Sequence, residues 1–267
     1  MALTMEGRLL SGRLGSHLSD VCTPGRVRDI SLNATATFFC AVLQDGSRLW
    51  CGSVDANGAH WTVRGENFTS SPVWSADDNG SCYLAVFRGT RALIHECLQT
   101  SPISEINLTT RPCVAAWSHA SPVLAIGHED GSLLFARPDG KRLYSVVVSS
   151  GPVTCLFWNA NGRTLVVGTD KFVHVLSLTG RMAAFEVQLQ SCVPAPAHCG
   201  AYRPRGKVFA TGCPDGTVLL CKPGMDNSLK LLSRTGGSIE ALSWSPNGKR
   251  LAVANATGEI RVLRVCR

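Results

Sequence analysis

Histidine is the side chain most suited to acid–base chemistry near neutral pH, and the sequence contains seven of them. They are His17, His60, His95, His119, His128, His174 and His198. A hydrolase needs a nucleophile, a histidine and an orienting acid that converge. His119 follows Ser118 and His128 precedes Glu129, but both lie in short polar stretches typical of turns. No G-x-x-x-x-G-K-[ST] or G-x-G-x-x-G motif occurs either. We therefore predict a non-enzyme with no cofactor and no small-molecule substrate.

Twelve cysteines raise the question of a disulfide framework or a metal site. The sequence contains no C-x-x-C pair, and most cysteines stand in apolar runs such as "FFCAV" and "VTCLFW". The tightest His/Cys group, His198, Cys199 and Cys213, lacks the paired spacing of metal ligands. We predict free thiols that pack as small hydrophobes in a reducing compartment, and no metal.

Basic residues are the third group whose side chains could take part in binding. The net charge is +7, and most of the 26 basic residues are Arg, which suits the binding of carboxylates and phosphates. Many of them stand in short polar stretches between apolar runs, so their meaning depends on the elements that position them.

Six similar segments organise the chain. Each contains an anchor residue, and the anchors recur at intervals of 41 to 44 residues: Leu32, Trp74, Trp117, Trp158, Tyr202 and Trp244. Seven residues after five of these anchors stands a large apolar residue: Phe39, Leu124, Leu165, Phe209 and Leu251. Three segments have Gly ten residues after the anchor: Gly127, Gly168 and Gly212. A period near 40 residues is typical of a repeat architecture.

A turn signal follows at a fixed place within the segment. Asp45-Gly46, Asp130-Gly131 and Asp215-Gly216 separate two apolar runs, and Thr257-Gly258 takes this place in the last segment. We predict a two-residue type I′ hairpin turn there, because both central residues of that turn need positive φ. The hairpin supplies two strands, and an apolar run before it and another after it each supply one more. Each segment is therefore expected to form four antiparallel strands.

A single four-stranded sheet leaves half of its apolar side chains in water, whereas sheets stacked radially bury both faces. We therefore predict an all-β fold, a single β-propeller domain over 1–267. Its blades are expected near 27–66, 67–110, 111–150, 151–191, 192–235 and 236–267. The last segment supplies three strands, and we expect residues 6–14 ("EGRLLSGRL") to complete it. A seventh blade built partly from 7–26, or a strand supplied by a partner, are the alternatives.

The stretch "ALSWSPNGKRLAVANATGEIRVLRV" resembles a blade of the WD-repeat family, and the similarity extends over residues 27–265. No third strand ends in Trp-Asp, and the Gly-His pair usual in that family is missing, so its His/Asp/Trp hydrogen-bond network is not expected. Third strands leading into "RPDGKRLYSV" and "SLTGRMAAFEV" are similar to propellers of intraflagellar transport subunits. The resemblance implies a scaffold for protein–protein interactions.

In an up-and-down blade, the first and third turns lie at one end of the sheet and the second turn at the other. Second turns carry acidic residues such as Asp45, Glu129, Asp130, Asp170 and Asp215. The first and third turns carry the candidate partner-binding residues Lys141, Arg142, Arg163, Arg181, Arg203, Arg205, Lys207, Lys249 and Arg250. This predicts one basic face, with the alternative that these charges only keep the loops soluble.

Two classes of partner fit such a face. The leading hypothesis is a scaffold that binds other proteins within a multi-subunit complex; the alternative is binding of RNA or a ribonucleoprotein. Bases would need aromatic side chains to stack on, and Tyr202 is the only aromatic among these basic residues. The chain begins without an apolar signal core and contains no run of 18 apolar residues. We expect a cytoplasmic protein, with cilium or nucleus as alternatives, that is neither secreted nor membrane-bound.

Overall fold

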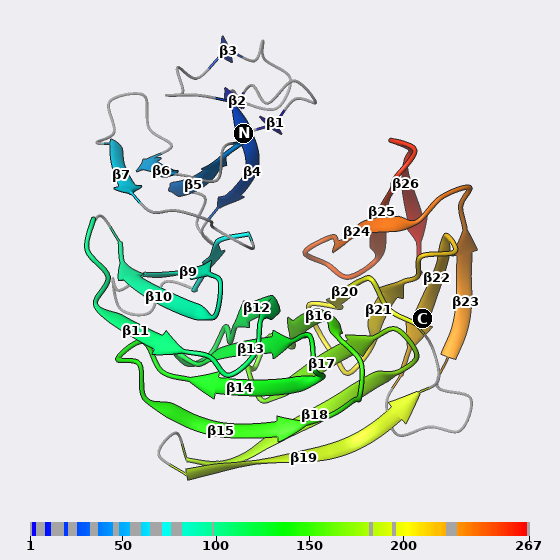
Figure 1. Ribbon diagram of the computed structural model, residues 1–267. Coiled ribbons are helices and arrows are strands. Elements are labelled where there is room, and N and C mark those ends of the chain that lie inside the picture. Colours follow the sequence, from blue (N-terminus) through cyan, green and yellow to red (C-terminus); the bar gives the residue numbers. More distant parts are fainter. Residues whose placement is uncertain are drawn as a thin grey trace. The chain divides into compact units, whose positions relative to one another are not determined.

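The computed structural model describes residues 2–3, 9–11, 19–20, 26–32, 37–44, 48–53, 60–64, 71–75, 82–97, 99–181, 184–193, 196–222 and 229–265. All regular secondary structure in these ranges is β-strand (Figure 1). Adjacent strands pair antiparallel and in chain order, which is the up-and-down topology that the sequence predicts. None of the described residues forms a helix long and apolar enough to cross a bilayer.

The chain divides into two compact units, and the first consists of Met1–Pro112 with Pro138–Gly140. A small sheet contains β1 (Ala2–Leu3), β2 (Leu9–Ser11) and β3 (Ser19–Asp20). The next sheet contains β4 (Val27–Leu32), β5 (Phe38–Leu43), β6 (Arg48–Ser53) and β7 (His60–Arg64). The third contains β8 (Val73–Trp74), β9 (Tyr83–Arg88), β10 (Arg91–Glu96) and β11 (Ser104–Asn107).

The second unit consists of Cys113–Arg137 and Lys141–Arg267. Its sheets are β12 (Pro112–Trp117), β13 (Leu124–His128), β14 (Ser132–Ala136) and β15 (Arg142–Val147); and β16 (Val153–Trp158), β17 (Thr164–Thr169), β18 (Val173–Arg181) and β19 (Ala184–Val193). They continue with β20 (Cys199–Tyr202), β21 (Phe209–Gly212), β22 (Thr217–Cys221) and β23 (Leu229–Arg234), and end with β24 (Ile239–Trp244), β25 (Arg250–Asn255) and β26 (Ile260–Arg264).

The six repeat segments each correspond to one sheet, but the described part of the expected closing strand, residues 9–11, pairs elsewhere. We predicted that residues 6–14 pair with the last strand. Instead, β2 lies between β1 and β3, with Leu10 opposite both Ala2 and Asp20, so both of its edges are already paired. Ala2–Leu3 is close in sequence, so closing this local loop costs little conformational entropy. The outcome is nearer to the alternative of an additional sheet formed by the N-terminal residues.

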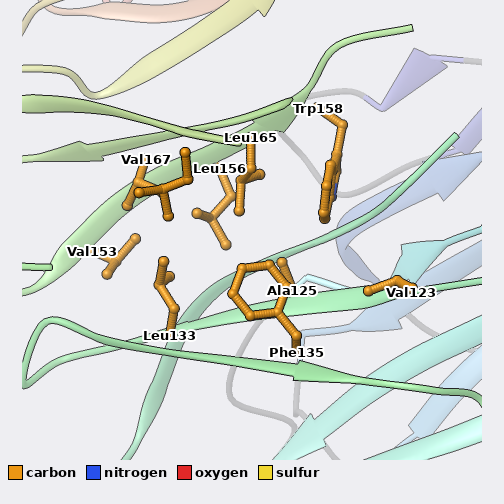
Figure 2. Packing of buried hydrophobic residues seen from close by; sticks show 10 residues of the cluster. Val123, Ala125, Leu133, Phe135, Val153, Leu156, Trp158, Leu165 and Val167 are labelled. Atoms are coloured by element: carbon orange, nitrogen blue, oxygen red, sulfur yellow. The ribbon is translucent and has the colours of Figure 1, made fainter. Parts of the chain in front are cut away.

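Successive sheets of the second unit pack face to face through the large apolar residues of the repeat. Figure 2 shows Leu133 and Phe135 of one sheet facing Val153, Leu156 and Leu165 of the next. The five predicted core residues seven positions after an anchor are all fully buried, with exposed fractions of 0%. Burial of a Leu or Phe side chain stabilises the fold by about 1.5–3 kcal/mol, so these positions contribute much of the core's stability.

The anchor tryptophans join neighbouring sheets by hydrogen bonds as well as by packing. The indole N–H of Trp158 donates to the carbonyl of Ala116 at 3.0 Å, and that of Trp244 donates to Ala201 at 3.0 Å. Within the first unit, Trp74 donates to Ser31 at 3.2 Å. Each acceptor is the residue just before the anchor of the preceding segment. The sheets are therefore held together by a repeated hydrogen bond between neighbours in addition to the packing of apolar side chains.

The glycine ten residues after the anchor makes room for the next sheet. A Cβ on Gly127 would lie 2.6 Å from Val153 Cγ1, and a Cβ on Gly212 would clash with Ile239. Val153 and Ile239 each begin the first strand of the following sheet. The repeat thus requires a residue without a side chain where two sheets approach most closely.

The second turns differ from the predicted type. The amide of Gly131 donates to the carbonyl of His128 at 3.2 Å, so Glu129 and Asp130 are the central residues and Gly131 is the fourth. Gly131 has φ +79°, as expected for a type I turn followed by a glycine bulge, not for a type I′ turn. Asp130 favours this arrangement because its Oδ1 accepts the amide of Ser132 at 3.0 Å.

Candidate interaction surface

The first and third turns lie at the same end of each sheet in the second unit, because consecutive strands are antiparallel. Adjacent first turns also meet: the Ser118 hydroxyl lies 3.4 Å from the carbonyl of Gly162, and the Nε of Arg203 donates to the carbonyl of Gly248 at 2.7 Å. We call the exposed basic residues at this end the first-turn surface. They are Lys141, Arg142, Arg163, Arg205, Lys207, Lys222, Lys249 and Arg250.

The backbone of these turns is fixed by local hydrogen bonds. Asn159 Oδ1 accepts the amides of Arg163 at 3.1 Å and Thr164 at 3.0 Å. In the last sheet, Asn247 Oδ1 accepts the amide of Lys249 at 3.0 Å, and Ser245 Oγ accepts that of Arg250 at 2.9 Å. Short polar side chains thus order the loops by turn chemistry. The basic side chains remain exposed on a defined backbone.

Arg203 has a different place from the other predicted residues. It is half-buried, its Nε donates to the carbonyl of Gly248 at 2.7 Å, and its guanidinium lies 5.6 Å from the centre of the Trp244 ring. A charge-assisted hydrogen bond and a cation–π contact tie it to the next sheet. Arg203 therefore joins the last two sheets. The side chain of Arg181, which was also predicted, lies outside the described residues.

Arg264 belongs to the same surface, although the sequence analysis did not select it. In the register between β25 and β26, Arg264 stands directly opposite Arg250, and both side chains are exposed. Like charges in directly opposed positions destabilise an antiparallel pair. Neither arginine has an acidic partner among the residues that the structure describes. The signal for Arg264 was present in the alternating stretch "IRVLRV", but only the strand register reveals its neighbour.

The second turns carry the opposite charge. Glu129, Asp130, Asp170 and Asp215 are all exposed, whereas Asp45 lies outside the described residues. Asp215 accepts the hydroxyl of Thr217 at 2.8 Å and its amide at 3.0 Å, and these hydrogen bonds hold the pKa of its carboxyl below the usual range. The carboxylate is therefore ionised at neutral pH. Exposed carboxylates thus gather in the second turns, together with Lys171, whereas the first-turn surface is formed by lysines and arginines; a difference in charge between the two ends stays a prediction.

One second turn contains Ser, His and Asp together, but in the wrong order for nucleophilic catalysis. Ser132 Oγ lies 3.1 Å from His128 Nδ1 and donates to Asp130 Oδ1 at 2.6 Å. In a catalytic triad, the acid orients the histidine. Here the carboxylate binds the serine, and burial lowers the pKa of His128. This group therefore serves as turn structure. Within the described ranges, no group of three or more His, Cys, Asp or Glu side chains could hold a metal ion.

Comparison with known families gives a match to the anaphase-promoting complex subunit 4 WD40 domain over residues 115–194 and 227–267. Two similar relatives are the F-box-like/WD repeat-containing proteins TBL1X of Mus musculus and Homo sapiens. Both are 22% identical over 191 residues, which is 70% of this chain but 34% and 31% of the two relatives. The chain thus spans about a third of their length.

A chain in a crystal structure of the mitotic checkpoint complex has the same fold, with a TM-score of 0.73 at 15% identity. The alignment covers 94% of this chain and 79% of the other. Together with the antiparallel sheets and their repeated anchors, these comparisons support a WD-repeat β-propeller. The fold is accordingly that of a β-propeller, and the chain is similar to WD-repeat proteins. The narrower resemblance to intraflagellar transport subunits stays a prediction.

Proposed function

We propose that this protein is a non-catalytic scaffold within a multi-subunit complex, and that its first-turn surface binds an acidic segment of another protein. The observation that carries the proposal is the exposed, ordered basic surface in which Arg250 and Arg264 stand opposite each other without an acidic neighbour among the described residues. A bound carboxylate would relieve this repulsion, and Arg presents two parallel donors to it.

The comparisons support the same class of function. Interaction within larger assemblies is typical of WD-repeat propellers, and two of the matches are the WD40 domain of anaphase-promoting complex subunit 4 and a chain in the mitotic checkpoint complex. Fixed loops on a rigid scaffold are also the usual location of binding residues. Protein is favoured over RNA because no described residue of the first and third turns in the second unit exposes an aromatic ring for base stacking.

A pair of matched double variants tests the proposal. Arg163→Glu with Lys249→Glu reverses two charges on the first-turn surface. Arg111→Glu with Lys171→Glu makes the same two changes at exposed positions outside it. Each tagged variant is used to capture proteins and nucleic acid from a lysate, with quantification by mass spectrometry and RNA sequencing.

The proposal expects a stable acidic protein partner that the first variant loses by at least about tenfold and the control retains, since each lost charge-assisted contact contributes about 1.5–3 kcal/mol. Equal loss or retention in both variants would contradict the surface assignment. Capture of abundant RNA that dissociates steeply with salt, without a stable protein, would contradict the class of partner.

A further inference from the structure

Two buried thiols face each other in the first four-stranded sheet. Cys40 of β5 stands directly opposite Cys51 of β6 in the strand register, and the thiol of Cys51 is directed at the sulfur of Cys40 with an Sγ–Sγ distance of 3.1 Å. Both side chains are fully buried, and neither cysteine is part of a disulfide. The residues are eleven positions apart, on the two strands of one hairpin.

The backbone already has the geometry that a bond between these sulfurs needs. Directly opposed residues of an antiparallel pair have Cα atoms about 4.5–5.5 Å apart. Disulfides span Cα separations of about 4.4–6.8 Å. Formation of the bond therefore needs only rotation of the two side chains, and the strand register can remain as it is.

Neighbouring thiols do not share this arrangement. Cys82 lies in the same apolar cluster and Cys97 packs against it. The amide of Cys97 donates to the carbonyl of Cys82 at 2.8 Å, so these two residues are also cross-strand neighbours. However, the Cys82 sulfur is directed at the carbonyl of Ser75, at 3.9 Å. Among the described residues of this cluster, the sulfur–sulfur contact that the structure shows is the one between Cys40 and Cys51.

We propose that Cys40 and Cys51 form a reversible disulfide, which makes this hairpin a site of oxidative modification. With oxidised glutathione as oxidant, one protein thiolate attacks it and releases one glutathione thiolate. The second protein thiolate then attacks the mixed disulfide and releases the other. Two protein thiols and one oxidised glutathione give one protein disulfide and two reduced glutathiones, so atoms, protons and electrons balance.

Burial decides when the exchange takes place. A thiol with no exposed surface cannot meet glutathione, so the hairpin must open transiently before the bond forms or breaks. In a reducing compartment the pair stays a dithiol. Once closed, the disulfide restricts the unfolded chain and raises the melting temperature by several degrees.

Peptide mapping tests the proposal, because trypsin separates the two residues. Cys40 lies in the peptide 29–48 and Cys51 in 49–64, each as its single cysteine. The full chain is equilibrated with reduced and oxidised glutathione, both in the folded state and during refolding from denaturant. Free thiols are then blocked, and the digest is analysed by mass spectrometry. Cys51→Ala and Cys82→Ala are treated in parallel.

The expected result is a linked pair of these two peptides in the wild type and in Cys82→Ala, reversed by dithiothreitol. Oxidation should raise the melting temperature in both proteins but not in Cys51→Ala. Refolding exposes the thiols to the buffer, so access is not limiting in that arm. A refolded protein with Cys40 and Cys51 still reduced, or linked to other cysteines, would overturn the proposal.

Discussion

Two buried histidines, His174 and His95, make the stability of this protein depend on pH. His174 on β18 is 6% exposed, and its Nε2 has no hydrogen-bond partner among the described residues. Burial lowers the pKa of this imidazole below the ordinary value of 6.5, because the charged form loses its hydration. His95 is buried in the same way, with a lowered pKa. The folded state therefore binds fewer protons near pH 6 than the unfolded state.

The consequence is a loss of stability in acid. Above pH 6.5 both states hold a neutral imidazole, whereas between 6.5 and the lowered folded-state pKa mainly the unfolded state takes up the proton. The free energy of unfolding should therefore fall as the pH decreases from 7.5 to 5.5. His174→Gln should reduce this slope, because it removes the buried imidazole. Urea unfolding at several pH values measures how the free energy of unfolding changes with pH. An equal pH dependence in wild type and His174→Gln would contradict the account.

The sheets themselves are joined by features that recur once per segment. A tryptophan donates its indole N–H to the preceding sheet, and a glycine admits the first strand of the following one. Both features lie where close packing leaves no spare volume. The stability of the second unit should therefore depend more on the glycines at these sheet contacts than on glycines in exposed linkers.

Two glycines offer a matched test of this statement. A Cβ at Gly212 would clash with Ile239 of the next sheet, whereas a Cβ at Gly236 would meet nothing within 4 Å, and neither residue has positive φ. Gly212→Ala should lower the free energy of unfolding by about 1–3 kcal/mol through overpacking. Gly236→Ala should be neutral or slightly stabilising, because it restricts the unfolded chain. Thermal unfolding compares them, and similar effects of both changes would refute the role of Gly212.

Sequence periodicity predicted the sheets well because burial and chain geometry impose it locally. The anchors Trp74, Trp117 and Trp158, the apolar residues seven positions later and the glycines at ten have the structural roles that such a period requires, whereas the anchor Leu32 is 39% exposed. Strands as short as β1 and β2 carry too few residues for a pattern, so their pairing was not predictable. The turn type was missed because an Asp-Gly pair fits two turn types, and the Asp130 side chain decides between them.

The candidate surface was predictable in part. Up-and-down topology places the first and third turns of a sheet at one end, so the exposed lysines and arginines there followed from the segment pattern. The separate role of Arg203 depends on a neighbouring sheet, and the apposition of Arg250 and Arg264 depends on strand register. Arg203 contacts a different segment, so no pattern within its own segment could reveal its role. Arg250 and Arg264 share one segment, but their opposition depends on the strand register, which the turn type decides.

At the scale of the whole molecule, the fold is a β-propeller similar to that of WD-repeat proteins, and we propose that the sheets of the second unit carry a basic binding surface at one end. Because the turns are ordered by their own hydrogen bonds, the basic residues are presented without the entropy cost of ordering a loop. Preorganised charges of one sign speed the encounter with an acidic partner and fix its orientation. This account predicts that a partner covers one end of the sheets and leaves the other accessible.

Lysine footprinting of the complex isolated from cells tests that prediction most directly. The tagged chain, free and in complex, is acetylated briefly, and mass spectrometry measures the modification of each lysine. The account predicts that the partner lowers acetylation at Lys207 and Lys249 severalfold, while Lys171 in a second turn reacts equally in both states. Protection of Lys171 with unchanged reactivity at Lys207 and Lys249 would contradict it.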